Sequence, residues 1–210
     1  YGNWEYDNDP AKLVNYDSIL DMWTNTHVAS GHKYITADIA RLGSDKAVIM
    51  AWDGWREIET ITFDKSKLTD IRDAIVLLKN KYGITNSNII ADEDGVGGGV
   101  VDFMRIKGFV NGSKALDNEN YANLKTQCYY KLADKINKGE VYLTTSKDKT
   151  QITEELEQVK RYKMDDDGKI RLLPKDKVKE VLGRSPDFSD TIMMRVWFDL
   201  NPNSGKYFVR

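Results

Sequence analysis

The chain has 210 residues, of which 40% are hydrophobic and 30% are charged, and its formal net charge is −2. This length suffices for a sizeable core, and no apolar stretch approaches the roughly 20 residues of a membrane helix, so no membrane partner is expected. One cysteine excludes an internal disulfide and favours a reducing compartment. One cysteine and two histidines also supply little for a structural zinc site or for Ser/His/Asp or Cys/His catalysis. Any chemistry must therefore depend on carboxylates.

Residues 1–30 lack strong periodicity, apart from a short possible helix over 17–23. We expect this stretch to be a linker that leads into a single domain over residues 31–210. Three strands are then predicted, over residues 33–40, 47–52 and 57–63. Because tight turns at 41–45 and at Asp53-Gly54 join them, these strands should be antiparallel neighbours. The period of two puts Asp38 on the same face of the first strand as Tyr34 and Thr36.

The next segment predicts a crossover. Apolar residues from Leu68 to Tyr82 recur at helical spacing, and Gly83 ends that helix. A short apolar strand over 89–91 follows and ends in Asp92. A strand–helix–strand unit predicts that this strand is parallel to one of the first three.

After Asp92 the chain runs through a glycine-rich stretch, 95–99, into an apolar pattern that can be helical and that Gly108 closes. A phosphate-binding loop is a poor interpretation, because neither G-x-x-x-x-G-K-[ST] nor G-x-G-x-x-G is present. Two interpretations remain open: a simple strand-to-helix turn, or a carboxylate presented to a metal ion where the backbone must turn tightly.

The second half predicts a fifth strand at 112–116, a helix over 121–136 closed by Gly139, a short strand at 141–143 and a helix over 152–159. Cys128 lies on the apolar stripe of the first of these helices, as a core residue would. A hairpin is expected over 161–173, with Asp165-Asp166-Asp167-Gly168 as its turn rather than a metal loop. A polar helix over 174–182 follows.

The segment from Lys160 to Arg184 carries nine basic residues against five acidic ones. It can form a basic lip beside an acidic site, or simply a solvated hairpin and helix.

The last helix is predicted to open with Ser185 as N-cap and Pro186 at the first helical position. Asp187 and Asp190 would then share one face of its first turn. Acids there complement the helix dipole, but the helix continues as an apolar run over 191–198 and should be buried, which favours a functional role.

Asp38, Asp92 and the Asp187/Asp190 pair thus offer carboxylates on three buried elements. Bringing them together costs several kcal/mol through repulsion and desolvation, and a divalent cation removes that cost. Mg²⁺ prefers hard carboxylate oxygens, and two ions can clamp the attacking and leaving oxygens of a phosphodiester.

This order of elements resembles the RNase H-like (retroviral integrase) superfamily, and more narrowly the C-terminal nuclease domain of the large terminase subunit of tailed bacteriophages. The resemblance covers about residues 30–200 and rests on three motifs in order, which begin at Asp38, at Asp92 and at Ser185. It implies an α/β fold: a mixed sheet of three antiparallel strands followed by parallel strands, flanked by helices, with an added basic β-hairpin.

The resemblance further implies an endonuclease that cuts concatemeric double-stranded viral DNA by hydrolysis with two Mg²⁺ or Mn²⁺ ions. Asp38, Asp92 and Asp190 match the catalytic, metal-binding acids, and Asp187 matches an auxiliary metal position. Glu93 and Asp94 adjoin the second motif without matching its core acid, and Asp45 is better explained by the hairpin turn. The expected DNA-binding residues are in the basic hairpin: Lys160, Arg161, Lys163, Lys169 and Arg171.

The implied partners are a terminase ATPase domain, the small terminase subunit and the procapsid portal, and the implied location is the host cytoplasm rather than the mature virion. No Walker A motif occurs in the chain, so the packaging ATPase is expected elsewhere. Two alternatives stay open. One is another RNase H-like nuclease, such as a junction resolvase or a transposase core; the other is a non-catalytic module that docks to DNA or to the packaging motor.

Overall fold

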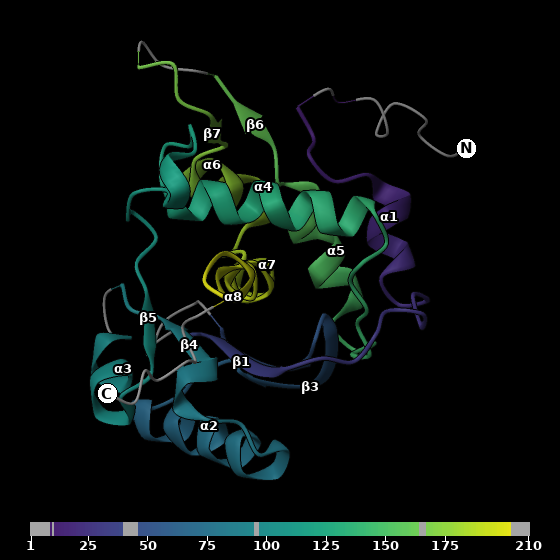
Figure 1. Ribbon diagram of the computed structural model, residues 1–210. Coiled ribbons are helices and arrows are strands. Elements are labelled where there is room, and N and C mark those ends of the chain that lie inside the picture. The colour runs from purple at the N-terminus through teal and green to yellow at the C-terminus, as the bar shows by residue number, and fades with distance from the viewer. Residues whose placement is uncertain (1–8, 10, 40–45, 95–96, 164–166, 203–210) are drawn as a thin grey trace.

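The computed structural model describes residues 9, 11–39, 46–94, 97–163 and 167–202. A central sheet separates two helical layers (Figure 1). Helices α2 (Leu68–Tyr82) and α3 (Gly98–Met104) cover one face, and α7 (Asp187–Met194) and α8 (Val196–Leu200) cover the other. Beyond α7 lie α4 (Leu124–Asn137) and α5 (Lys149–Glu157). The remaining helices are α1 (Tyr16–Asp21), α6 (Lys175–Leu182) and the short 3-10 turns η2 (Asn86–Asn88) and η3 (Leu116–Asn118).

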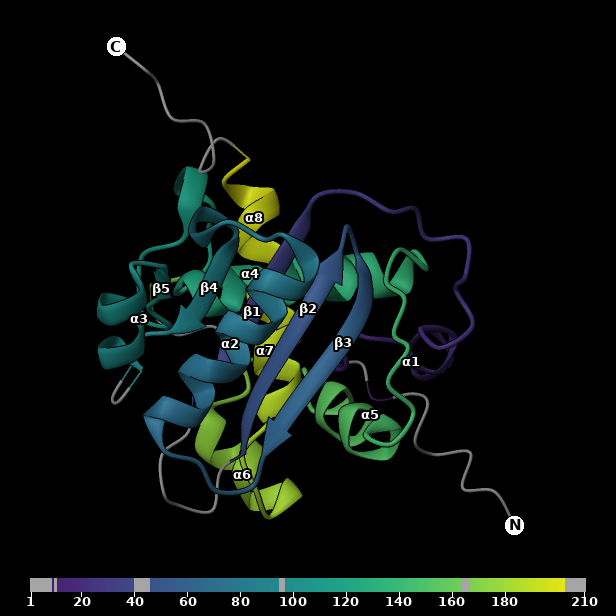
Figure 2. The same cartoon turned by 90° about the horizontal axis from the view of Figure 1, so that it is seen from below.

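The sheet has the order β3-β2-β1-β4-β5, seen from the α2 side in Figure 2. Its strands are β1 (Lys33–Asp38), β2 (Ala47–Asp53), β3 (Arg56–Phe63), β4 (Ile89–Asp92) and β5 (Lys107–Phe109). The first three pair antiparallel, β4 pairs parallel with β1, and β5 pairs parallel with β4. The predicted antiparallel meander and the parallel crossover are therefore confirmed.

The predicted fifth strand at 112–116 is wrong. The strand lies earlier, at Lys107–Phe109, so Gly108 is inside it and does not close α3. The helix ends sooner because Arg105 takes the left-handed conformation, with φ of 53°, and turns the chain directly into β5. Phe109 is then fully buried beside β4. The expected strand at 141–143 is reduced to a single bridge between Tyr142 and Arg56.

The position of strand β2 between the two helical layers explains why its sequence is apolar without alternation. Ala47, Ile49 and Ala51 pack in the core under α2, whereas Val48, Met50 and Trp52 pack in the core under α7. Both faces of this strand are covered, as a continuous apolar run indicates. On β1, Thr36 lies on the α7 side and accepts a hydrogen bond from Trp52 Nε1 at 3.0 Å. By the period of two, Asp38 lies on that side as well.

Residues 11–30 share the core of the domain. Val14, Ile19 and Met22 are buried in the same cluster as α4, α5 and α7. Packing among the described residues does not separate this stretch from residues 31 onward, and a preceding ATPase domain stays an expectation. Among the described helices, none is long and apolar enough to cross a membrane.

The hairpin forms as predicted, from β6 (Arg161–Tyr162) and β7 (Arg171–Leu172), and it projects beyond α4 (Figure 1). Asp45, Asp165 and Asp166 lie outside the described residues. The last predicted helix is interrupted: α7 ends at Met194, and α8 starts at Val196.

Gly97 shows what the glycine-rich turn requires. A Cβ atom at this position would lie 1.8 Å from the carbonyl oxygen of Asp92, closer than any real contact. The chain therefore needs glycine here because the start of α3 packs directly on the backbone that carries Asp92.

Gly97→Ala is expected to destabilise the domain by roughly 1–3 kcal/mol, because the clash is with backbone that must shift. Gly99→Ala is the matched control in the same helix, since its Cβ would meet only Leu68 Cδ1 at 3.8 Å. That control should be neutral or gain up to about 1 kcal/mol from reduced chain entropy. Urea unfolding of the two variants measures both effects, and equal behaviour would contradict this account.

Candidate active site

Asp38 and Asp92 are the last residues of two adjacent parallel strands, β1 and β4. Ala37 pairs with Ala91 in the parallel β1–β4 ladder, and each aspartate is the next residue of its strand. Parallel strands end at a common carboxyl edge, so the two carboxylates face the same region. Asp38 is only 7% exposed, whereas Asp92 is half-buried.

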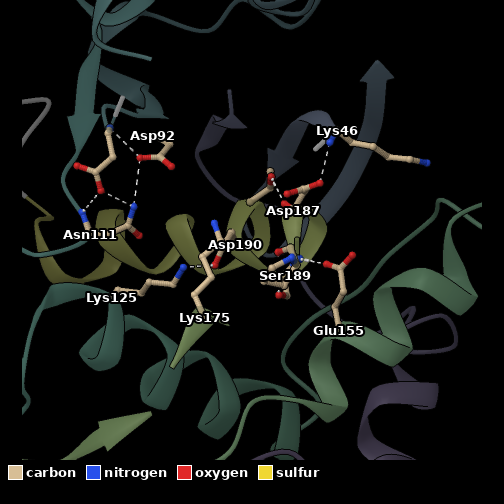
Figure 3. A network of polar contacts seen from close by, with 12 residues as sticks. Lys46, Asp92, Asn111, Lys125, Glu155, Lys175, Asp187, Ser189 and Asp190 are labelled. Carbon is tan, nitrogen blue, oxygen red and sulfur yellow. Dashed lines mark hydrogen bonds and ion pairs between the residues drawn. The ribbon is translucent and has the colours of Figure 1, made fainter. Parts of the chain in front are cut away.

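Helix α7 brings two more carboxylates to this edge. It packs against β1 and β2, and Asp187 and Asp190 are 3% and 5% exposed in its first turn. Burial raises the pKa of Asp38 well above its usual range, and the charges of Asp190, Asp187 and Asp92 raise it further. The four acids predicted from the sequence therefore form one electrostatic cluster around Asp38. Figure 3 shows Asp92, Asp187 and Asp190 of this cluster.

Asp190 is paired with two lysines. Lys125 Nζ lies 2.7 Å from one carboxylate oxygen, and Lys175 Nζ lies 3.3 Å from the other. Tyr129 donates its hydroxyl hydrogen to Asp190 Oδ1 at 2.6 Å. Burial alone would raise the pKa of Asp190, but Lys125 and Lys175 outweigh it and the pKa is lowered. Lys175 shows the reciprocal effect: burial lowers its pKa, but Asp190 and Asp38 raise it by more.

Asp92 is held by amide groups instead. Its Oδ1 accepts from the backbone N–H of Asp94 at 3.0 Å and from Asn111 Nδ2 at 3.2 Å. Asn111 Nδ2 also donates to Asp94 Oδ2 at 2.7 Å, which ties the two acids together. Burial raises the pKa of Asp92 even though the Asp94 N–H acts in the opposite direction. Glu93 continues the sheet, since its N–H donates to the carbonyl of Phe109.

The predicted DNA-binding residues lie on the hairpin or next to it, and Lys160 also lines a cavity together with Lys175 and Asp190. Arg161, Lys163 and Lys169 are exposed. Lys160 pairs with Asp9 at 3.1 Å, and Arg171 pairs with Asp167 at 2.7 Å, so both are partly neutralised.

The donor chemistry of the cluster fits a hard divalent cation. Carboxylate oxygens are the ligands that Mg²⁺ and Mn²⁺ prefer, and the repulsion at Asp38 is the cost that such an ion removes. In the described residues no three Asp, Glu, His or Cys side chains converge closely enough to enclose an ion. Lys125 and Lys175 occupy the oxygens of Asp190 instead.

The sequence patterns do not predict the residues that surround the acids. Lys125 and Lys175 are in the first turns of α4 and α6, where a positive charge opposes the helix dipole, and this misplacement was a usable signal. Glu155 lies three residues after Ile152 on the buried stripe of α5, where an acid is out of place. No comparable signal marks Asn111.

The sheet order and the helical layers define an RNase H-like α/β fold, as predicted. Solved structures with this fold include nuclease domains of phage large terminase subunits. The domain from gp2 of bacterial virus Sf6 aligns with a TM-score of 0.77 at 18% identity, over 88% of this chain and 97% of that one.

The large terminase nuclease from thermophilic phage G20c, solved with bound magnesium, aligns with a TM-score of 0.57 at 16% identity. The alignment covers 89% of this chain and 96% of that one. The large terminase nuclease domain from Thermus phage P74-26 aligns with a TM-score of 0.58 at 14% identity, over 89% of this chain and 95% of that one. No protein-family model and no curated protein matches the chain. These likenesses confirm the predicted fold and its resemblance to the terminase nuclease domains.

The electrostatics predict opposite effects for two conservative substitutions. Asp38 has a raised pKa, so its contribution to stability is present at low pH and is lost as pH rises through the folded-state pKa. Asp38→Asn should therefore stabilise the metal-free protein at pH 7, by roughly 1–3 kcal/mol. Asp190 has a lowered pKa, and its contribution is lost as pH falls through that value. Asp190→Asn should destabilise the protein at pH 7 by roughly 2 kcal/mol, since it leaves the partly buried Lys125 and Lys175 without the carboxylate that pairs with both.

Thermal unfolding in EDTA at pH 4 and pH 7 measures both variants. The difference between them should shrink at the lower pH. Destabilisation by Asp38→Asn at pH 7 would show that this acid has a structural partner, and would contradict the described cluster.

Proposed function

We propose that this chain is a divalent-metal-dependent endonuclease that cuts double-stranded DNA. The observation that carries the proposal is the meeting of Asp38, Asp92, Asp187 and Asp190 at one edge of an RNase H-like sheet. A structural role does not account for it, because burial and the charges of the other acids raise the pKa of Asp38, which costs stability at neutral pH. Such strain persists in proteins where a site requires it.

The proposed chemistry is phosphodiester hydrolysis with two ions, Mg²⁺ or Mn²⁺. When bound, the ions would supply an activated water and would stabilise the leaving oxygen. Asp38, Asp92 and Asp190 would hold them, with Asp187 assisting. The hydrogen bonds from Asp94 N–H and Asn111 both go to Asp92 Oδ1, so they leave its second oxygen for an ion.

Lys125 and Lys175 have a second role in this proposal. They neutralise the charge of Asp190. With Asp190 holding a cation, their ammonium groups would be available to the phosphate oxygens of the DNA strand. The exposed basic residues of the hairpin, Arg161, Lys163 and Lys169, would contact the backbone of the duplex further away.

The biological setting of the proposal is genome packaging in a tailed bacteriophage. The aligned domains of Sf6, G20c and P74-26 are nucleases of large terminase subunits, which supports it. The substrate would then be concatemeric viral DNA in the host cytoplasm. An ATPase domain, a small terminase subunit and a procapsid portal would be the partners.

Cleavage of supercoiled plasmid tests the proposal. The wild type should nick and linearise the plasmid with Mn²⁺ or Mg²⁺ and should stop when EDTA is added. Asp92→Asn should lower the rate roughly 100-fold or more, because the variant loses a charged ion ligand. Asp73→Asn is the matched control, since Asp73 is an exposed acid on α2, behind the sheet. Cleavage that survives Asp92→Asn, or that needs no metal, would contradict the proposal.

The hairpin makes a separate prediction about DNA affinity. DNA binding is measured in Ca²⁺, so that the duplex is bound but not cut. Lys163→Ala and Lys169→Ala should each weaken this binding, and each should reduce the slope of log affinity against log salt concentration by about 1. Lys65→Ala, an exposed lysine just before α2, serves as the control. Fluorescence anisotropy over a range of salt concentrations measures the slopes. An equal effect of all three variants would remove the hairpin from the DNA-binding surface.

A further inference from the structure

The first turn of α7 is not capped as its sequence predicts. The helix begins at Asp187, so Pro186 is the N-cap and Ser185 lies one residue further out. The ring of Pro186 has no hydrogen-bond acceptor, and Ser185 Oγ is buried without a hydrogen bond to any described residue. The N–H of Ser189, three positions into the helix, is therefore left for another group to satisfy.

Glu155 of α5 supplies the missing acceptor. Ser189 N donates to Glu155 Oε2 at 2.8 Å, across 34 residues of chain, as Figure 3 shows. The other oxygen, Oε1, accepts from Gln151 Nε2 at 3.3 Å, and Arg184 Nη2 lies 3.7 Å from it. The side chain of Glu155 is fully buried, so both oxygens are turned to the protein.

A hydrogen bond matters more here than at an ordinary helix start, because packing on this turn is incomplete. A cavity of about 250 Å³ lies against it, lined by Pro186, Ser189 and Asp190 of α7 and by Glu155 itself. Apolar side chains do not fill this space, so on this side the turn is not held by close packing. Glu155 lines this cavity, and its carboxylate accepts a hydrogen bond directly from the backbone of Ser189.

The same bond network reaches Asp187. Lys46 donates its backbone N–H to Asp187 Oδ2 at 2.8 Å and its ammonium group to Gln151 Oε1 at 3.4 Å. Gln151 in turn holds Glu155. Helix α7 is thus connected to α5 through the backbone of Ser189 and, by way of Lys46, through the side chain of Asp187.

A carboxyl in this place is costly. Burial raises the pKa of Glu155 to about 8, although the Ser189 N–H and Arg184 act against the shift. An apolar residue would complete the stripe of α5 without that penalty. The position is therefore explained by what the carboxyl does for α7, not by its contribution to the core.

We propose that Glu155 is a positioning residue that caps α7 from α5 and so holds Asp187 and Asp190 towards Asp38. The inference rests on the proposed function, since positioning has an effect only if these acids bind a cation. It adds a residue from a different helix, one that touches neither metal nor DNA.

The test compares Glu155→Ala with Glu155→Gln, which keeps an acceptor oxygen for the Ser189 N–H. Glu154→Ala is the matched control, because Glu154 is the exposed neighbour that pairs with the same Arg184 at 2.9 Å. Hydrogen exchange of the segment 186–190 reports on the cap. Titration with Mn²⁺, followed by calorimetry and by the rate of plasmid cleavage, reports on positioning.

In Glu155→Ala, exchange should accelerate in 186–190 but not in 191–194, and the half-saturating Mn²⁺ concentration should rise about 10- to 100-fold. The rate at saturating Mn²⁺ should stay near that of the wild type, and Glu155→Gln should restore both readouts. A merely structural role would lower activity through unfolding and would leave the metal constant unchanged.

Unchanged exchange in Glu155→Ala would overturn the cap. Faster exchange with an unchanged metal constant would overturn the positioning role alone. A wild type that binds no Mn²⁺ would count against the proposed function and with it the positioning role, whereas the exchange data would still judge the cap.

Discussion

Electrostatic repulsion among buried carboxylates is the constraint on which the rest of this structure depends. Asp38 is almost enclosed, and the charges of Asp190, Asp187 and Asp92 act on it together. Folding must bring these carboxylates together against their mutual repulsion, which costs free energy. Neighbouring cations offset only part of that free energy. Lys125 and Lys175 neutralise Asp190, and no described lysine or arginine forms an ion pair with Asp38. The arrangement is explained if a divalent cation completes it.

Helix α7 is the element that imposes this arrangement. All eight of its residues are buried between the sheet and the outer helices, so its position leaves little freedom to the acids in its first turn. Its far end is held where Arg195, 3% exposed, donates to the carbonyl of Gly54 and pairs with Asp199 at 2.9 Å. Its near end is held by Glu155. The helix is thus fixed at both ends by polar groups from other elements, and the acids are carried by a rigid support.

The acids could be predicted from the sequence because each depends on a local rule. The period of two along a strand predicts which face of the sheet carries Asp38. The strand–helix–strand crossover predicts that Asp92 ends a strand parallel to one of the first three. Helical spacing predicts that Asp187 and Asp190 share one face of their helix. The partners could not be predicted in the same way. Asn111 reaches Asp92 only because β5 lies at 107–109, and that strand was missed since three residues give no periodic signal. The cap of α7 was assigned to Ser185 because local propensity favours it, but a contact from α5 replaced it.

The central claim is that the carboxylate cluster is a cation site, and thermal unfolding at increasing Mn²⁺ concentration tests it most directly. An ion that binds only the folded state raises the melting temperature in proportion to its occupancy. The account predicts a clear rise for the wild type and little or none for Asp38→Asn, although that variant should start from the higher stability in EDTA. Equal rises in both proteins, or no rise in the wild type, would contradict the claim.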